Sequence, residues 1–130
     1  MRDLKSNITS GVSLAPQSLT AAANGTGVDL QNSDSAVVEF NAGAIGGTTP
    51  SFTMAVQESD DNTTFTDVAA ADLQGTAPVI TTTNAGITMV GYLGSKRYIR
   101  AIAKTVTGTT PTLLASAAVL RSRLAIKGTT

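Results

Sequence analysis

The stretch SFTMAVQESDDNTTFTDV (residues 51–68) carries the clearest structural signal in the chain. Phe52, Met54 and Val56 occupy alternate positions, the period at which side chains of a β-strand point to one face. The residues SDDNT that follow favour a turn, and the apolar pattern resumes at Phe65. The stretch therefore predicts a β-hairpin whose loop is longer than two residues.

Further segments show the short apolar patterns of β-strands, and turn-forming residues separate them. These segments are residues 37–40, 79–94 (one strand, or two broken near residue 84), 97–106 and 113–120. We interpret GAIGGTTP (43–50) as a loop and TGTTP (107–111) as a turn, because glycine and proline favour both. Residues 69–78 fit a short helical turn or an irregular loop. No segment keeps a long apolar period of 3.6 residues, so we predict about seven short strands.

The composition favours the same class of fold. The chain has 130 residues, enough for one domain that buries about two thirds of the surface its unfolded form exposes. Hydrophobic residues make up 42% and aromatic residues only 4%, and there are 12 glycines. Valine and threonine, which favour pleated surfaces, are frequent. We therefore expect an all-β protein, a small antiparallel β-sandwich with an extended N-terminal arm.

The chain divides into an N-terminal arm (1–27), a β-sandwich domain (28–120) and a basic C-terminal tail (121–130). Apolar residues in the first segment are irregularly spaced, and a proline interrupts them. This segment is either a frayed terminus or an extended arm that docks onto a neighbouring subunit. We favour the arm, because scattered apolar side chains gain nothing in water and suit a segment that orders on binding. Its candidate interface residues are Leu4, Ile8, Val12 and Leu14.

Charge is unevenly distributed along the chain. All nine acidic residues lie at or before Asp72, whereas seven of the nine lysines and arginines lie from Lys96 onward. One interpretation is that acidic and basic strands lie side by side in one sheet and form cross-strand pairs. The alternative is that the two poles face different neighbours in an assembly, where complementary charge favours specific contacts.

The strand around residues 97–104 has two different sides. We expect Ile99, Ala101 and Ala103 to be buried, which leaves Tyr98, Arg100, Ile102 and Lys104 on a mixed basic and apolar face. That face is a candidate interface, although cross-strand pairing with Glu39 or Glu58 would also explain its charges. Candidate interface residues in this half of the chain are Tyr92, Lys96, Arg97, Tyr98, Arg100, Arg121 and Arg123.

The residue types of most catalytic and metal sites are absent. The chain has no histidine and no cysteine, which removes the usual general base, disulfides and thiolate metal sites. VGYLGSKRYIRAIAK (90–104) superficially resembles a phosphate-binding loop, but its serine precedes its lysine and a strand pattern follows. Asp60 and Asp61 fall in the predicted hairpin loop, where we expect solvated turn residues. We therefore predict no enzyme activity, no cofactor and no metal site.

Targeting signals are also missing from the sequence. The N-terminus lacks the apolar core of a signal peptide, and no run approaches the roughly 20 apolar residues that span a bilayer. We expect a soluble protein made in a reducing cytoplasm, with no membrane partner. Because the formal net charge is zero and aromatics are scarce, we do not expect nucleic acid as a partner.

Three successive stretches carry a resemblance to a known family. GTGVDLQNSDSAVVEFNAG (25–43), FTMAVQESDDNTTFTDVAAADLQG (52–75) and VGYLGSKRYIRAIAKTVTGTTP (90–111) resemble the head decoration, or cement, proteins of tailed bacteriophages. In that family a VQESDD…FTDV hairpin precedes a GY.GSKRY.R strand and a TGTTP turn. The likeness covers roughly residues 25–120, and both ends of the chain match the pattern least.

The resemblance implies a structural virion protein. Such a protein is a β-sandwich that binds the major capsid protein on the outer capsid surface, bridges its subunits and stabilises the expanded head. It implies assembly in the host bacterial cytoplasm and a homo-oligomer, for which we favour a trimer over a dimer. It assigns no function to any single residue. Alternatives are a head-completion or tail protein or, in a different class, a module that binds host-surface glycans or nucleic acid; scarce aromatics count against glycans.

Overall fold

The protein is a single antiparallel β-sheet of nine strands in the residues that the structure, a computed structural model, describes (5–31 and 33–123). The all-β fold class is therefore confirmed. In chain order the elements are η1 (Lys5–Asn7), β1 (Ile8–Leu19), β2 (Ala23–Asn24), β3 (Val28–Asp29), β4 (Ser33–Ser59), β5 (Thr66–Asp67), η2 (Ala70–Asp72), β6 (Leu73–Gln74), β7 (Val79–Ile80), β8 (Gly86–Tyr92) and β9 (Tyr98–Arg123), where η marks a 3-10 turn. The turn η2 is the short helical turn considered for residues 69–78.

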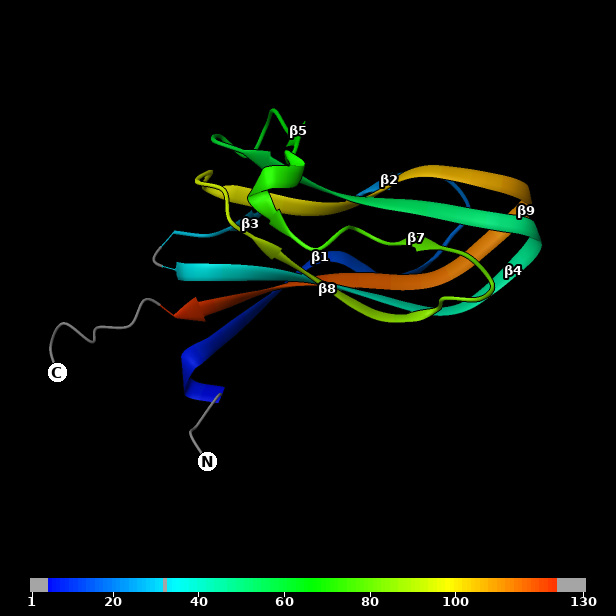
Figure 1. Ribbon diagram of the computed structural model, residues 1–130, viewed down its shortest axis with the longest axis horizontal. Helices are drawn as coiled ribbons and strands as arrows, with labels where there is room; N and C mark the ends of the chain where they lie inside the picture. Colours follow the sequence, from blue (N-terminus) through cyan, green and yellow to red (C-terminus); the bar gives the residue numbers. More distant parts are fainter. Residues whose placement is uncertain (1–4, 32, 124–130) are drawn as a thin grey trace, which may run out of the picture.

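Two long strands, β4 and β9, organise the whole molecule. They are 27 and 26 residues long and pair with each other from Ser33 opposite Arg123 to Ser59 opposite Tyr98. Both strands bend together near their middle, so that each contributes one half to each of two layers (Figure 1). The predicted loop at 43–50 and turn at 107–111 are wrong, because both segments lie inside these strands. Four predicted short strands are thus the halves of two long ones.

The bend coincides with a four-residue sequence, Gly-Thr-Thr-Pro, that occurs once in each long strand. The two copies, residues 47–50 and 108–111, face each other, with Thr48 opposite Thr109. Gly47 and Gly108 have φ angles of 104° and 113°, which favour glycine because it has no Cβ. The second threonine of each copy, Thr49 or Thr110, also has a positive φ. Turn-forming residues therefore bend both strands at the same level without reversing either.

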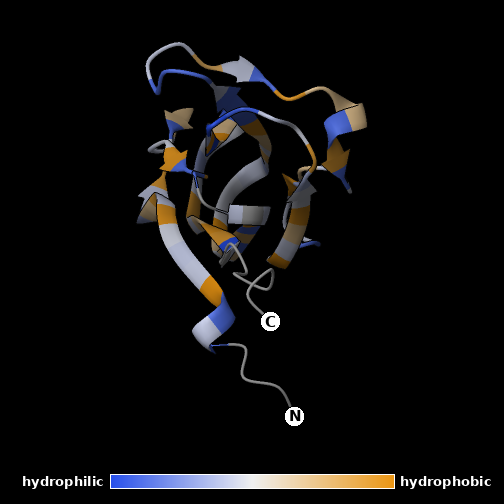
Figure 2. Ribbon diagram, turned by 90° about the vertical axis from the view of Figure 1, so that its left-hand side faces the viewer, coloured by the Kyte–Doolittle hydropathy of each residue, from blue (hydrophilic) through white to orange (hydrophobic). Residues whose placement is uncertain are grey.

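The first layer contains β1, the C-terminal half of β9, the N-terminal half of β4, β8, and the short β6, in that order. The second layer contains the other halves of β9 and β4. There β2 and β3 pair with β9, and β5 and β7 pair with β4. Viewed from the side in Figure 2, the strands surround a common interior. The two-layer arrangement of a sandwich is thus made by one sheet folded over.

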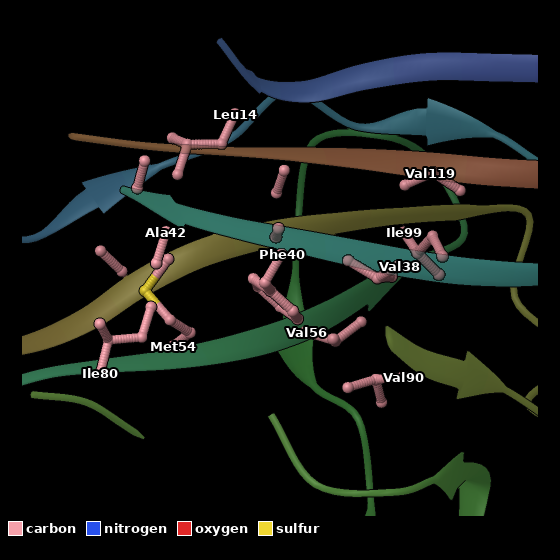
Figure 3. Packing of buried hydrophobic residues seen from close by; sticks show 14 of the residues in the cluster. Leu14, Val38, Phe40, Ala42, Met54, Val56, Ile80, Val90, Ile99 and Val119 are labelled. Atoms are coloured by element: carbon pink, nitrogen blue, oxygen red, sulfur yellow. The ribbon is translucent and has the colours of Figure 1, made fainter. Parts of the chain in front are cut away.

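The core fills the space between the layers with alternate side chains of the strands. In the opening stretch Phe52, Met54 and Val56 are buried, and β5 pairs with residues 57 and 58, so the predicted hairpin is confirmed. Figure 3 shows Met54 and Val56 in one interior with labelled side chains from β1, β7, β8 and β9. Fully burying one such aliphatic or aromatic side chain stabilises the fold by about 1.5–3 kcal/mol.

The predicted N-terminal arm needs correction. Residues 8–19 form β1, which pairs with β9 over its whole length, and Leu14 and Leu19 are buried in the core. Two register shifts, between Val12 and Leu14 and between Leu14 and Gln17, break the alternation of apolar residues that would have revealed the strand. Pro16 is tolerated because β1 is an edge strand. The predicted tail also begins too early, since β9 continues to Arg123; residues 124–130 and Leu4 lie outside the described residues.

Candidate docking surface

The first layer turns an apolar face to the outside of the molecule. Even-numbered residues of β4 from Ala36 to Ala42 point into the core, so the odd-numbered ones point outward with their partners on neighbouring strands. We call this surface the apolar outer face. Its apolar members are Ile8, Val12, Val37, Ile87, Met89, Leu114, Ala118 and Leu120.

Strand register places these side chains in rows across the four strands. Val12 lies opposite Ala118, which lies opposite Glu39, which in turn lies opposite Met89. In the next row, Leu120 lies opposite Val37. Side chains directly opposite on neighbouring strands are close enough to contact each other. Polar side chains interrupt the apolar ones: Glu39 in the row of Val12, and Asn41 and Ser116 in the row of Ile87.

Several members of this face are unusually exposed for their type. The exposed fractions are 59% for Val12, 62% for Ile87, 56% for Met89 and 52% for Leu114. Glu39 is the one charged side chain that points outward from these strands within the part of the chain that the structure describes. An exposed apolar patch on one face of a rigid sheet is the kind of surface that docks onto another protein.

The outer face of the second layer is polar by comparison. Lys104 Nζ pairs with Asp67 Oδ2, and Arg100 donates two hydrogen bonds, of 2.9 and 2.7 Å, to Gln57 Oε1. The Arg100 guanidinium also lies 4.0 Å from the centre of the Phe65 ring. The two faces therefore differ in character: one offers apolar side chains, the other polar groups already bonded to one another.

The uneven charge distribution is explained by pairs within the molecule. Lys96 Nζ lies 2.8 Å from Asp60 Oδ2, and Arg97 Nη2 lies 2.9 Å from Asp29 Oδ2. A second bond, from Arg97 Nε to Asp29 Oδ1, makes that pair bidentate. Together with the pair on the second layer, these contacts join late bases to early acids within one molecule, although only the Lys104–Asp67 pair joins residues of two strands.

Asp29 is the carboxylate most affected by its neighbours. The hydrogen bonds from Arg97 lower the pKa of Asp29 to about 2, and the backbone N–H of Gln31 adds to this effect. The hydrogen bonds to Asp29 raise the pKa of Arg97. Arg121 Nη1 donates to the backbone oxygen of Asp29 at 2.9 Å, while Arg121 Nε is buried without a hydrogen-bond partner.

Tyr92, proposed as an interface residue, is instead buried, with 6% of its surface exposed. Its hydroxyl donates to Glu58 Oε1 at 2.7 Å and accepts from the backbone N–H of Lys96 at 3.1 Å. Burial, followed by the bond to Glu58, raises the pKa of Tyr92 above its usual range. Within the stretch 90–104, which superficially resembles a phosphate-binding loop, the backbone at Lys96 is therefore held by a hydrogen bond to the Tyr92 hydroxyl.

The structure separates the remaining candidate interface residues. Ile8 and Val12 belong to the apolar outer face, whereas Leu14 is a core residue. Half-buried Tyr98 contacts the Arg97 guanidinium, which lies 5.2 Å from its ring centre. As expected, Ile99, Ala101 and Ala103 are buried; Ile102, assigned to the exposed side, is buried as well. Arg123 ends β9, and its side chain lies outside the described part.

Sequence reasoning missed the largest side chains of the apolar outer face. Ile87, Met89 and Leu114 lie in strands that are apolar at nearly every position. Such a run is equally consistent with a strand buried on both sides, so the spacing of apolar residues does not indicate that one side is exposed. Their exposure depends on which face of the first layer packs against the second, and no residue pattern within a single strand shows that.

A shallow groove of about 460 Å³ lies beside the Tyr92 hydroxyl and is lined by Ser33, Ser35, Ser95 and the Lys96–Asp60 pair, among others. Its charged groups already have partners: Lys96 pairs with Asp60, and Arg97 pairs with Asp29. Within the described residues, no three acidic, histidine or cysteine side chains gather where they could hold a metal ion. None of the described helices has the length and apolar content to cross a membrane.

Comparison with known proteins identifies no relative: no family model, no curated protein and no solved structure matches this chain.

Proposed function

We propose that this protein is a structural virion protein, a decoration protein of a tailed-bacteriophage head. It binds the major capsid protein on the outer surface of the virion and bridges neighbouring subunits of the expanded shell. The observation that carries the proposal is the apolar outer face on a folded-over sheet. The family resemblance of residues 25–120 supplies the identity of the partner.

The mechanism is burial of apolar surface against the capsid. Val12 and Leu114, each little more than half exposed, would each contribute about 1 kcal/mol on burial, roughly half of the value for a fully exposed side chain. The layer that presents them is held by long β4–β9 pairing, so little order must be gained on binding. Many copies on one symmetric shell would stabilise it together even if each contact were modest.

The proposal assigns no enzymatic role to the chain. The chain has no histidine or cysteine. In its second half, most of the described lysine and arginine side chains pair with carboxylates or amides. Because Lys96, Arg97 and Arg100 already have such partners, docking is assigned to apolar residues and not to these charges. Assembly onto the head takes place in the host bacterial cytoplasm.

The test uses purified protein and expanded, undecorated capsids. We expect the protein to co-sediment with the capsids and to raise the melting temperature of the shell. A variant with Val12→Asp and Leu114→Asp should lose both effects, because each change places a charge in the contact. The matched control is Thr105→Asp, an exposed site on the second layer.

The possible outcomes test two statements separately: that the protein binds capsids, and that it binds them through the apolar outer face. A wild-type protein that neither co-sediments nor shifts shell melting contradicts the decoration role. If it binds isolated necks or tails instead, it is a head-completion or tail protein. Capsid binding that survives the double substitution but fails in Thr105→Asp would move the contact to the other layer.

A further inference from the structure

Glu39 lies within the apolar outer face and has no partner there. It belongs to β4 and lies between Ala118 of β9 and Met89 of β8. Within the residues that the structure describes, no hydrogen bond or ion pair involves its carboxylate, whereas three aspartates each pair with a lysine or an arginine. The Glu39 carboxylate is therefore available to a group outside the molecule.

The sequence suggests a different place for Glu39, opposite the bases of residues 97–104. In the structure those bases lie in the second layer, where Arg100 bonds to Gln57 and Lys104 pairs with Asp67. Glu39 points outward from the first layer, and none of the described lysine or arginine side chains points outward from the strands of that layer. These strands therefore offer the carboxylate no cation.

Docking through the apolar outer face would remove water from this carboxylate. Glu39 is already partly buried among its neighbours, and Val12 and Met89 in the same row are more than half exposed. A charge that loses its water without gaining a partner opposes binding, whereas a charge that meets a cation adds to it. A partner that matched only the apolar side chains would leave Glu39 unpaired in the contact.

We propose that the partner presents a lysine or an arginine that pairs with Glu39, surrounded by apolar side chains that pack on the rest of the apolar outer face. This inference rests on the proposed function, in which the partner is the major capsid protein, and it adds the chemistry of the capsid surface that is recognised. The apolar contacts supply the area that is buried. The ion pair fixes the orientation of the protein on the shell and excludes surfaces without the cation.

Charge complementarity distinguishes this partner from other occupants of the face. Two copies of the chain stacked face to face would bring two Glu39 carboxylates together, with no described lysine or arginine from these strands to pair with them. An anionic membrane surface or a nucleic acid backbone would also meet Glu39 with a like charge. A protein surface that carries a cation complements both the carboxylate and the apolar side chains around it.

The test measures binding of the full chain to expanded, undecorated capsids by co-sedimentation over a range of protein concentrations. Glu39→Leu is the decisive variant, because a capsid with the cation and a capsid without it predict opposite results. With the cation, leucine leaves that cation unpaired and should weaken binding about tenfold or more. Without the cation, leucine removes an unpaired charge and enlarges the apolar surface, so binding should tighten.

Asn41→Leu is the matched control. Asn41 lies two residues further along β4, points outward from the same face and carries no charge. This variant should bind as well as the wild-type protein or better. Glu39→Lys should bind more weakly than Glu39→Leu, because it sets a like charge against the cation of the capsid. Circular dichroism checks that the variants fold, and the comparison of the two leucine variants does not depend on Glu39→Lys.

The failure of this inference differs from the failure of the decoration role. Glu39→Leu that binds as tightly as the wild-type protein, or an equal loss in Asn41→Leu, would overturn the inference and leave the decoration role standing. A wild-type protein that does not bind capsids would contradict both. Self-association of the free protein that disappears with Val12→Asp and Leu114→Asp would assign the face to a second copy, and this result would also overturn the inference.

Discussion

The side chain of Ser13 completes a backbone hydrogen bond that the strands themselves leave open at Ala101. Ser13 Oγ accepts from the buried N–H of Ala101 at 2.8 Å and donates to the backbone oxygen of Thr26 at 2.8 Å. It thereby joins β1, the segment before β3, and β9 at one buried point. Ser13 is 3% exposed, so water cannot readily replace these bonds.

Substitution Ser13→Ala should therefore lower the free energy of unfolding by about 1–3 kcal/mol, because it leaves the buried N–H of Ala101 without a partner and removes the bond to the Thr26 carbonyl. Urea unfolding of the two proteins measures the difference. The control is Ser18→Ala on the same strand, where the side chain is exposed and the change should be nearly neutral. Equal effects of the two substitutions would contradict the bridging role.

Gly47→Ala and Gly108→Ala, one in each copy of the bend sequence, should each lower the free energy of unfolding by a similar amount. A Cβ at Gly47 would lie 2.7 Å from the Thr110 oxygen, and one at Gly108 would lie 2.8 Å from the Thr49 oxygen. Contact with backbone and a positive φ together predict a loss of about 1–3 kcal/mol for each. Gly43→Ala, where the nearest atom lies 3.4 Å away, is the control. Thermal melting that spares Gly47→Ala and Gly108→Ala would show that the bend does not need glycine.

The Asp29–Arg97 pair should make stability depend on acid pH. The folded pKa of Asp29 is about 2, below its ordinary value of 3.8, so its contribution is complete above the ordinary value and is lost as pH falls toward 2. Because the Asp29 side chain is 40% exposed, we expect no more than about 1 kcal/mol. Asp29→Asn should lack this part of the decline between about pH 5 and pH 2.

Arg97→Gln serves as the partner variant for that experiment. It removes the donor that lowers the Asp29 pKa, so it should flatten the same part of the pH profile. The double variant should lose little beyond either single one, since both act through one contact. Additive effects would mean that the two residues stabilise the fold separately.

Tyr92 should give the opposite dependence at alkaline pH. Its pKa is raised in the folded protein, so its contribution is complete below its ordinary value of 10.0 and is lost as pH rises above that value. Tyr92→Phe removes the titrating group and the bonds to Glu58 and Lys96. The variant should be less stable at neutral pH by about 1 kcal/mol but less sensitive to pH above 10. An unchanged alkaline profile in chemical unfolding would exclude Tyr92 as its source.

The local hairpin could be predicted from the sequence because its alternating residues and turn are contiguous. The length of β4 and β9 could not, since Gly-Thr-Thr-Pro looks the same whether it reverses a strand or bends one. Recognising the bend requires knowing that residues 47–50 and 108–111 face each other, which is a long-range fact. The strand β1 could not be predicted either, because its two register shifts interrupt the alternation of apolar residues and depend on how β1 pairs with β9.

The candidate surface was only partly predictable. Ile8 and Val12 are predicted interface residues of a docking N-terminal arm; they lie on an outer face, but as part of β1 within the sheet. The uneven distribution of charge along the sequence suggests the arginines and lysines as interface residues. Their pairing with acids of the same molecule depends on which segments are neighbours in the fold, which the sequence does not show. Apolar outward residues carry no such mark.

The paired bend also determines how the molecule would respond to load. In a sandwich of two separate sheets, only loops and side-chain packing oppose forces that pull the sheets apart. Here β4 and β9 cross from one layer to the other as hydrogen-bonded backbone, with Thr48 and Thr109 side by side at the crossing. Tension applied to one layer passes through covalent chain into the other. Pulling the layers apart therefore straightens the bend at residues 47–50 and 108–111, while β4 and β9 can stay paired on both sides of it, so the two layers should remain joined after the side-chain packing between them is lost.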